Sequence, residues 1–257
     1  MRISIAVALL VLAPACSASL EDPANTGIGA TFDSGTGTAE DASVGGTDSG
    51  ATPDAAPVCT VAKSVYLNFE GQTLTRAATS DATQNQAAWM NKATGTAPKF
   101  RDGVGTRAAD IVAITDGVKA QVTGLGVEVV TTRPVAGPYV MVVFGGTAGQ
   151  IGSNFGRAVQ KLDCGNLVMS DVAWISDAPA NNQVAINNTL GAIGFGLGLT
   201  ATTDTDDCMC GWDNACTQTT GACTLATTIA RDPAANQTCP NVSSQNEQAA
   251  FTAGFCP

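Results

Sequence analysis

Val184-Ala-Ile-Asn-Asn-Thr-Leu-Gly-Ala-Ile-Gly-Phe-Gly-Leu-Gly-Leu-Thr-Ala-Thr-Thr203 is a run without a single charged side chain. A segment this apolar is expected to be buried. Its interior carries Gly191, Gly194, Gly196 and Gly198. Each glycine would cost about 1 kcal/mol relative to alanine inside a helix, and alternation of glycine with Phe and Leu has the period of a strand. Periodicity alone therefore leaves both helix and strand open.

Three β-rich runs bounded by Gly or Pro lie upstream of this segment, at residues 64–69, 127–132 and 139–144. We predict a strand in each, and a further strand at residues 167–175. The fold class that these strands indicate depends on the segment between the first two of them.

Residues 107–122 separate them and predict an amphipathic helix between a cap at Thr106 and Gly124. Its apolar positions recur at helical spacing: Ala108, Ile111, Val112, Thr115, Val118 and Val122. Strand, helix, strand and strand in this order favour an α+β (or mixed α/β) fold, with a mixed sheet and a helix packed on one face.

Four segments, in chain order, resemble secreted metzincin-like (zincin) metalloprotease domains of bacteria. They are Ser64-Val-Tyr-Leu-Asn-Phe-Glu-Gly71, Val130-Thr-Thr-Arg-Pro134, residues 139–146 and Leu162-Asp-Cys-Gly-Asn166. The resemblance covers roughly residues 64–209. It implies a zincin-like mixed sheet with packed helices and a zinc-binding helix in the apolar segment.

In such proteases the helix carries H-E-x-x-H-x-x-G-x-x-H, whose histidines bind zinc and whose glutamate activates the zinc-bound water. With Gly198 as the turn glycine, the ligand positions fall on Gly191, Phe195 and Ala201, and the general base falls on Ala192. The whole chain contains no histidine, so these motif positions are vacated. We therefore expect no catalytic residue, no bound metal and no cofactor, although the resemblance implies zinc.

Asp207-Cys208-Met209 falls where related sequences place an Asp-x-Met turn beneath the metal. The resemblance therefore implies that Met209, like Gly198, belongs to a turn of this site. Small or apolar residues at the four vacated positions predict dry packing in place of a charged, hydrated site.

Two other metal sites can be drawn from the sequence. Cys208, Cys210, Cys216 and Cys223 supply four sulfurs for a structural zinc, but disulfides are favoured in an exported chain. Asp204, Asp206, Asp207 and Asp213 offer oxygens to calcium, but the spacing lacks the Gly and distal Glu of an EF-hand loop. A solvated acidic loop is the favoured interpretation.

Carboxylates give the alternative enzymatic hypothesis, because serine and cysteine nucleophiles usually need a histidine base. Glu70, Asp163 and Asp171 are candidates for a glycosidase-like acid and base, with turn or surface roles as the simpler interpretation. Trp89, Trp174 and Trp212 are either core residues or parts of a sugar or peptide platform.

The N-terminus reads as an export signal over residues 1–15, with Arg2 followed by a short apolar stretch. Small residues directly before Cys16 are typical of bacterial lipoprotein signals, so we predict a lipid anchor on Cys16, with ordinary cleavage nearby as the alternative. Residues 16–57 predict a disordered acidic tether, and residues 58–257 predict one domain with a Cys-rich part at 208–257.

The cysteine count fits this organisation. Of 9 cysteines, removing Cys16 leaves eight disulfide candidates: Cys59, Cys164, Cys208, Cys210, Cys216, Cys223, Cys239 and Cys256. Complete pairing indicates an oxidising compartment, and we expect an outer-membrane or cell-surface lipoprotein, or a released extracellular protein.

The net charge of −10 lies largely in the tether, and no Lys/Arg cluster suits phosphate, so we expect no nucleic-acid partner. Besides the membrane, which the lipid would contact, three functions stay open. The preferred one is a catalytically inactive metalloprotease-like domain that binds a peptide, protein or polysaccharide. The alternatives are a hydrolase using carboxylates or a Cys/Asp-held metal, and a structural envelope protein.

Overall fold

The central sheet has five strands in the order β5-β1-β6-β8-β7, all parallel except the edge strand β7. Their bounds are β1 Ser64–Asn68, β5 Glu128–Val130, β6 Tyr139–Phe144, β7 Ala158–Val159 and β8 Val172–Ile175. The computed structural model describes residues 63–178, 181–240 and 242–255, which belong to one compact unit, Pro53–Pro257. The fold is α+β, as predicted.

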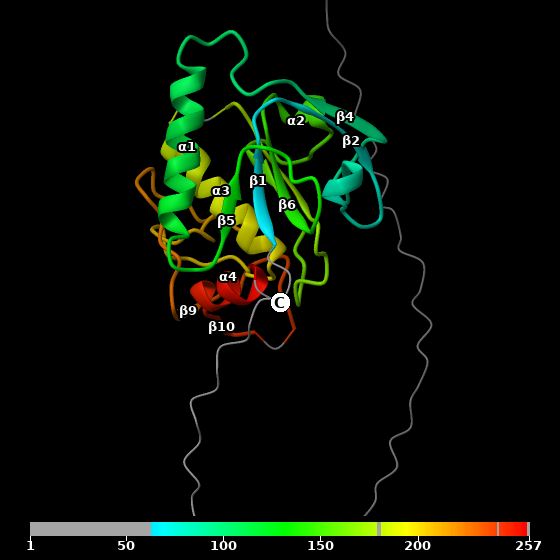
Figure 1. The fold of residues 1–257 in the computed structure, drawn as a ribbon. Coiled ribbons are helices and arrows are strands. Elements are labelled where there is room, and N and C mark those ends of the chain that lie inside the picture. Colours follow the sequence, from blue (N-terminus) through cyan, green and yellow to red (C-terminus); the bar gives the residue numbers. More distant parts are fainter. Residues whose placement is uncertain (1–62, 179–180, 241, 256–257) are drawn as a thin grey trace, which may run out of the picture. The chain divides into compact units, whose positions relative to one another are not determined.

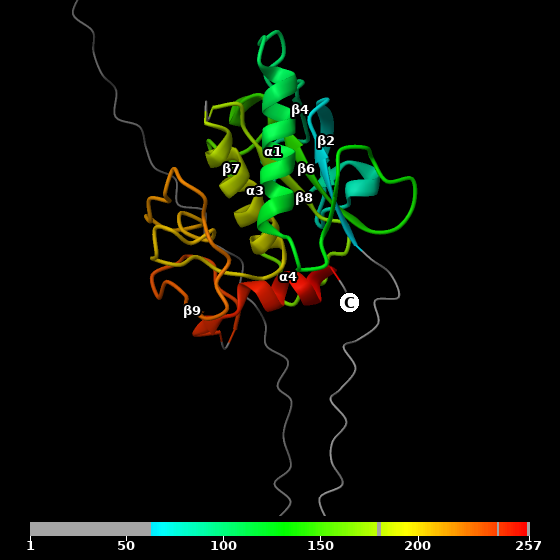
Figure 2. The same ribbon diagram turned by 60° about the vertical axis from the view of Figure 1, so that its left-hand side comes forward.

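Two helices cover one face of this sheet, α1 (Arg107–Gln121) and α3 (Asn182–Gly196) (Figures 1 and 2). Alternate strand residues point toward them, so Val65 and Leu67 of β1 pack with Ile114 of α1 and Leu190 of α3. This layer holds the larger hydrophobic core.

The opposite face of the sheet is covered by a small second sheet of order β3-β2-β4 and by short helices. These are β2 Gln72–Arg76, β3 Gln86–Ala87, β4 Thr94–Ala97, the 3-10 helix η1 Ala82–Gln84 and α2 Ala148–Ile151. Tyr66 and Met141 of the central sheet pack here with Leu74 and Ile151. Because both faces are covered, β1, β6 and β8 are buried at every position.

The apolar segment forms a helix despite its glycines. The Asn181 side chain accepts a hydrogen bond from Gln183 N at 2.8 Å and begins α3. Three glycines of α3 lie where other groups approach its backbone: Trp212 at Gly191, Met209 at Gly194 and Gln160 at Gly196. Tertiary packing therefore outweighs the intrinsic cost of the glycines.

Sequence and structure differ in detail elsewhere. Val112 is 58 % exposed and Ala108 is also exposed, whereas Ile114, outside the predicted stripe, is fully buried. The predicted apolar face of α1 was therefore partly wrong, because the helix contacts the sheet and α3 through a different stripe. The last predicted strand is shorter than residues 167–175, and Leu167 is 79 % exposed.

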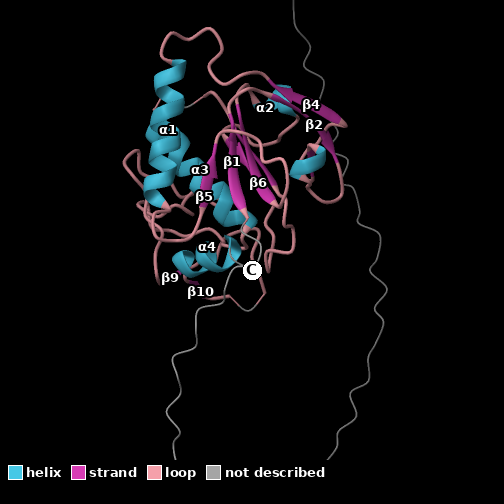
Figure 3. Ribbon diagram, in the orientation of Figure 1, coloured by secondary structure: helices cyan, strands magenta, loops and turns pink. Residues whose placement is uncertain are grey.

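The region after α3 is mostly irregular and contains β9 (Ile229–Ala230), β10 (Ser244–Gln245) and α4 (Glu247–Phe255) (Figure 3). Disulfides hold it together: Cys164–Cys239, Cys208–Cys223 and Cys210–Cys216. The prediction of disulfides is confirmed for these six cysteines.

Several predictions fall outside the described residues: the signal at 1–15, Cys16, the tether, and the disulfide candidates Cys59 and Cys256. Among the helices that the structure does describe, none is both long enough and apolar enough to span a membrane.

Candidate functional site: a groove between β7 and α3

A cavity of about 450 Å³ opens between the edge strand β7 and helix α3. Residues 155–160, which include β7, form one wall, and residues 210–220 form the other. Helix α3 supplies the floor through Val184, Asn188 and Phe195. We call this cavity the groove.

The strand wall exposes one free edge. Among the described residues, β7 pairs with β8 alone and ends the sheet, so its other edge has no strand partner there. Ser176 N donates to Arg157 O at 2.8 Å, which turns the backbone of Arg157 toward β8. In an antiparallel pair successive residues alternate, so the N–H and C=O of Ala158 point away from β8, toward the groove. That edge can pair with an extended chain.

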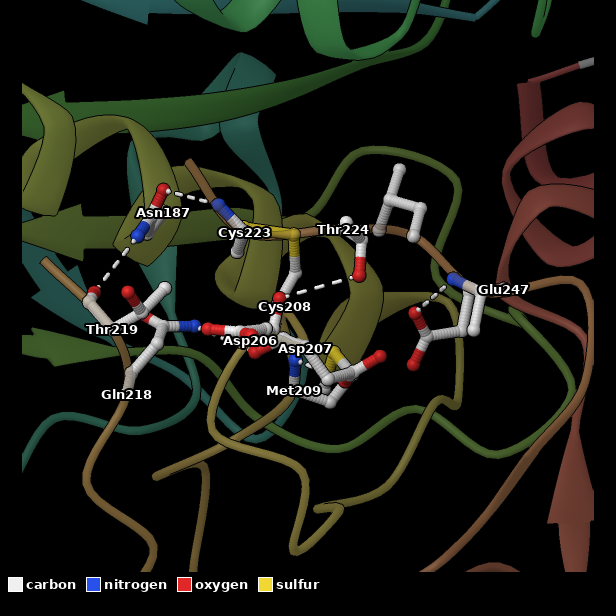
Figure 4. Close-up of a disulfide and its surroundings, with 12 residues drawn as sticks. Asn187, Asp206, Asp207, Cys208, Met209, Gln218, Thr219, Cys223, Thr224 and Glu247 are labelled. Atoms are coloured by element: carbon white, nitrogen blue, oxygen red, sulfur yellow. Dashed lines mark hydrogen bonds between the residues drawn. A yellow bond between two sulfur atoms is a disulfide. The ribbon is translucent and has the colours of Figure 1, made fainter. Parts of the chain in front are cut away.

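The loop wall is tied to the helix and to itself, as Figure 4 shows around the Cys208–Cys223 disulfide. Asn187 of α3 donates to Thr219 O at 3.2 Å and accepts from Cys223 N at 3.2 Å. Gln218 Nε2 donates to Cys208 O at 2.9 Å. The Cys210–Cys216 disulfide lies in the same wall. This wall is therefore fixed relative to the floor.

An indole covers Gly191, the first position that the resemblance aligns with a zinc ligand. A Cβ built on Gly191 would lie 1.8 Å from Trp212 Nε1, so the indole occupies the space of a side chain there. The centroid of the Trp212 ring lies 5.6 Å from that of Phe195, which the resemblance aligns with a second zinc ligand. Both side chains are buried, so two aromatic rings pack together beside Gly191.

The remaining motif positions lie nearby. Ala192 and Ala201 are fully buried, and the Ala201 carbonyl accepts from Asp232 N at 2.7 Å. Gly198 has φ +85°, so the turn after α3 takes the left-handed conformation that glycine favours. Met209 is fully buried with its sulfur beside Gly194.

The sequence hypothesis of a sulfur-bound zinc is wrong for the described cysteines, because its four sulfurs are paired as two disulfides. The aspartates that could have held calcium are used separately: Asp204 accepts from Asp206 N at 3.0 Å, and Asp213 accepts from Gln237 N. Within the described ranges, no three His, Cys, Asp or Glu side chains lie close enough together to hold a metal ion.

The three candidate catalytic carboxylates do not form one site. Glu70 is exposed and pairs with Arg107 at 2.7 Å and Lys99 at 3.3 Å. Asp163 and Asp171 line a separate cavity of about 100 Å³, with room for a few waters. Burial raises the pKa of Asp171 to about 6, although hydrogen bonds from Val172 N and Ser80 oppose this shift.

The tryptophans do not form a common platform either. The buried Trp174 donates from Nε1 to Gly145 O at 2.8 Å, and Trp89 donates to Val172 O at 2.7 Å. Both belong to the core on the far face of the sheet, whereas Trp212 belongs to the core around α3. Only Trp212 lines the groove.

Sequence reasoning missed a buried carboxyl pair, Asp207 and Glu247, beside the groove wall (Figure 4). Asp207 Oδ1 accepts from Met209 N at 2.8 Å and from Thr202 Oγ1 at 2.9 Å, while its buried Oδ2 accepts from no N–H group of the described residues. The Asp207 carboxyl interacts directly with the Glu247 carboxyl. Glu247 accepts from Ala226 N at 3.0 Å. Burial first, and the charge of Asp207 second, raise the pKa of Glu247 to about 8. No local pattern pairs residues so distant in the chain.

No protein-family model matches the chain, and no curated protein is significantly similar to it.

Proposed function

We propose that this chain is an exported lipoprotein whose metzincin-like (zincin) domain has lost its catalytic side chains and binds an extended peptide in the groove. The observation that supports this proposal most strongly is the free edge of β7, which forms one wall of the groove above α3. Main-chain hydrogen bonds to such an edge bind a peptide without a metal or a base.

Three features support kinship with metalloproteases. Helix α3 follows strand β8, as the motif helix follows a strand in that family. Gly198 makes the left-handed turn after the helix, and Met209 lies buried beside Gly194. Trp212 packs on Gly191 and on the Phe195 ring, at the two positions that the resemblance aligns with zinc ligands. A site of this composition suits binding better than hydrolysis.

Disulfides are consistent with an exported protein. We further propose that a lipid attached to Cys16 holds the protein at the outer membrane or cell surface. The peptide partner would then be outside the cytoplasm.

A second candidate function is that of a hydrolase that uses carboxylates as its acid and base. Asp163 and Asp171 line one small cavity, and burial holds the pKa of Asp171 near 6, which suits a general acid. The groove is favoured because it has room for a ligand. A structural envelope protein, the third hypothesis, would bind no ligand saturably.

Replacing Ala158 by Pro tests the proposal, because proline removes the outward N–H without breaking a bond to β8. We expect fluorescent dodecapeptides, selected from a random library on the oxidised protein, to bind at least about tenfold more weakly to Ala158→Pro. Ala158→Ser keeps the N–H and should bind as the parent protein does. Equal binding by all three, at unchanged melting temperature, would exclude the β7 edge as the binding element.

A further inference from the structure

Lys63 is enclosed in the core at the point where β1 begins. The residue is 1 % exposed, and its N–H donates to Phe255 O at 3.2 Å, so the start of β1 lies against α4 (Figure 1). Its amine lies 5.4 Å from the centroid of the Phe255 ring, and no carboxylate oxygen of the described residues lies within 4.0 Å of it. The Lys63 amine is therefore buried without an ion pair in this part of the chain.

Burial lowers the pKa of the Lys63 amine, because an ammonium ion loses most of its solvation there. The charges of Asp171 and Asp163 oppose this shift without reversing it. A larger fraction of the amine is then neutral at a given pH. A neutral, desolvated lysine amine is a nucleophile, whereas the ammonium ion is not.

This amine contacts the side-chain amide of Asn166, in the loop between β7 and β8. Lys63 Nζ donates to Asn166 Oδ1 at 2.9 Å. The carbonyl carbon lies one C=O bond of about 1.23 Å beyond Oδ1, so it is about 4 Å or less from Nζ. Asn166 Nδ2 donates to Gly254 O at 3.3 Å, which holds the amide at its other end. The nucleophile and the electrophilic carbon are thus held close to the separation of about 3–3.5 Å at which such groups react.

Asp171 supplies a carboxyl near these two groups. Of the two carboxylates that act on the Lys63 amine, Asp171 acts more strongly. The residue is 2 % exposed, and burial raises its pKa to about 6. A carboxyl that exchanges its proton near neutral pH can take a proton from one nitrogen and deliver it to another.

We propose that Lys63 and Asn166 join in an intramolecular isopeptide bond, with Asp171 relaying the proton. The neutral Nζ attacks Asn166 Cγ and forms a C–N bond. The Asp171 carboxylate takes one proton from Nζ and delivers it to Nδ2, the Cγ–Nδ2 bond breaks, and ammonia leaves. The product is a secondary amide, and the reaction consumes no oxidant, reductant or other reactant. Asn166 is half-buried, so the ammonia can escape to solvent.

The bond joins two residues that lie 103 positions apart in the chain. A cross-link of this length constrains the unfolded chain as a disulfide does. The Cys164–Cys239 disulfide ends in the same loop as Asn166, but a thiol reductant can open it. An isopeptide bond therefore keeps the start of β1 tied to this loop under reducing conditions as well.

Mass spectrometry of the purified full chain tests the proposal without any variant. Loss of ammonia lowers the mass by about 17 Da. After reduction, alkylation and proteolysis, tandem spectra should contain a branched pair of peptides joined through the Lys63 and Asn166 side chains. Recovery of both peptides only in unlinked form would overturn the proposal.

Variants identify the two reactants. Lys63→Met and Asn166→Gly each remove one of them, and glycine suits the left-handed backbone at position 166, where φ is +50°. Neither variant should lose ammonia. Lys92→Met is the matched control, because this exposed lysine also donates to a carbonyl, Gly149 O at 2.6 Å, and its replacement should leave the link intact. Ammonia loss that persists in Lys63→Met would indicate an asparagine succinimide and contradict the isopeptide bond.

The part played by Asp171 is tested by the linked fraction at a fixed time after synthesis. We expect Asp171→Asn to lower this fraction at least about tenfold, since the amide cannot relay a proton. Asp171→Glu keeps a carboxyl and should retain part of the reaction. Equal linked fractions in the parent and in Asp171→Asn, at unchanged melting temperature, would overturn the relay.

Discussion

Replacing Gly191 by Ala is expected to lower the free energy of unfolding by about 2 kcal/mol, although alanine is the better helix former. The new Cβ would lie 1.8 Å from Trp212 Nε1 and 2.6 Å from two ring carbons, so the indole must move. Overpacking of this kind costs about 1–3 kcal/mol or more, and the gain in helix propensity of about 1 kcal/mol offsets part of it. Urea denaturation of the oxidised protein measures the difference.

Gly194→Ala is the matched control on the same helix. Its Cβ would meet the Met209 sulfur at 2.7 Å, and a thioether at the end of a flexible side chain can move aside. We expect a smaller loss of stability than for Gly191→Ala.

A double-mutant cycle attributes the effect to the indole. Trp212→Ala should itself cost about 3–5 kcal/mol. In that background Gly191→Ala should become stabilising by about 1 kcal/mol, because only the helix propensity remains. The same destabilisation in both backgrounds would show that Trp212 does not occupy this site.

The stability of the protein should fall as the pH rises from about 4.5 to about 8, because of the Asp207–Glu247 pair. The folded-state pKa of Glu247 is about 8, above its unfolded value of 4.5. Between these values the folded protein holds a proton that the unfolded chain has released. Unfolding then releases a proton, so the free energy of unfolding decreases with pH, by at most about 1.4 kcal/mol per pH unit for one proton.

Asp207→Asn should flatten this dependence and raise stability at pH 8. The Asn oxygen can keep the hydrogen bonds from Met209 N and Thr202, while its NH₂ replaces Oδ2 and can donate to the Glu247 carboxylate, with which Asp207 interacts directly. The like charge disappears and an amide donor takes its place. Denaturant titrations from pH 4 to pH 9 compare the variant with the parent.

Asp171→Asn is the control for this experiment. Burial raises the pKa of Asp171 to about 6, so this group lowers stability with rising pH only between about 3.8 and 6. Its replacement should flatten the lower range and leave the change between pH 6 and 8 intact. If Asp207→Asn left the upper range unchanged, the carboxyl pair would not be its source.

The sequence predicts β1, β5 and β6 of the central sheet because β-branched runs bounded by Gly or Pro are local signals. The runs at 64–69 and 139–144 became β1 and β6 almost residue for residue. The face of α1 was less predictable, since its burial depends on where α3 crosses it. For the apolar segment, glycine content argued against the helix that packing selects.

The groove could be predicted only in part. The resemblance predicts Gly191 and Phe195 as vacated motif positions, but nothing local indicates that Trp212, beyond the helix, fills the space beside Gly191. β7 has two residues, too few for a periodic signal, and its role comes from its position at the sheet edge. Asp207 and Glu247 meet only through the folded C-terminal region.

The most direct test of the central claim is to measure binding and cleavage on the same peptides. The oxidised protein is incubated with the selected dodecapeptides, with and without added zinc, and both bound and free peptides are identified by mass spectrometry. We predict saturable binding that Ala158→Pro weakens, with every peptide recovered intact under both conditions. Cleavage by the parent protein that is lost in Asp171→Asn or that depends on zinc would contradict the claim that this fold binds peptides without hydrolysing them.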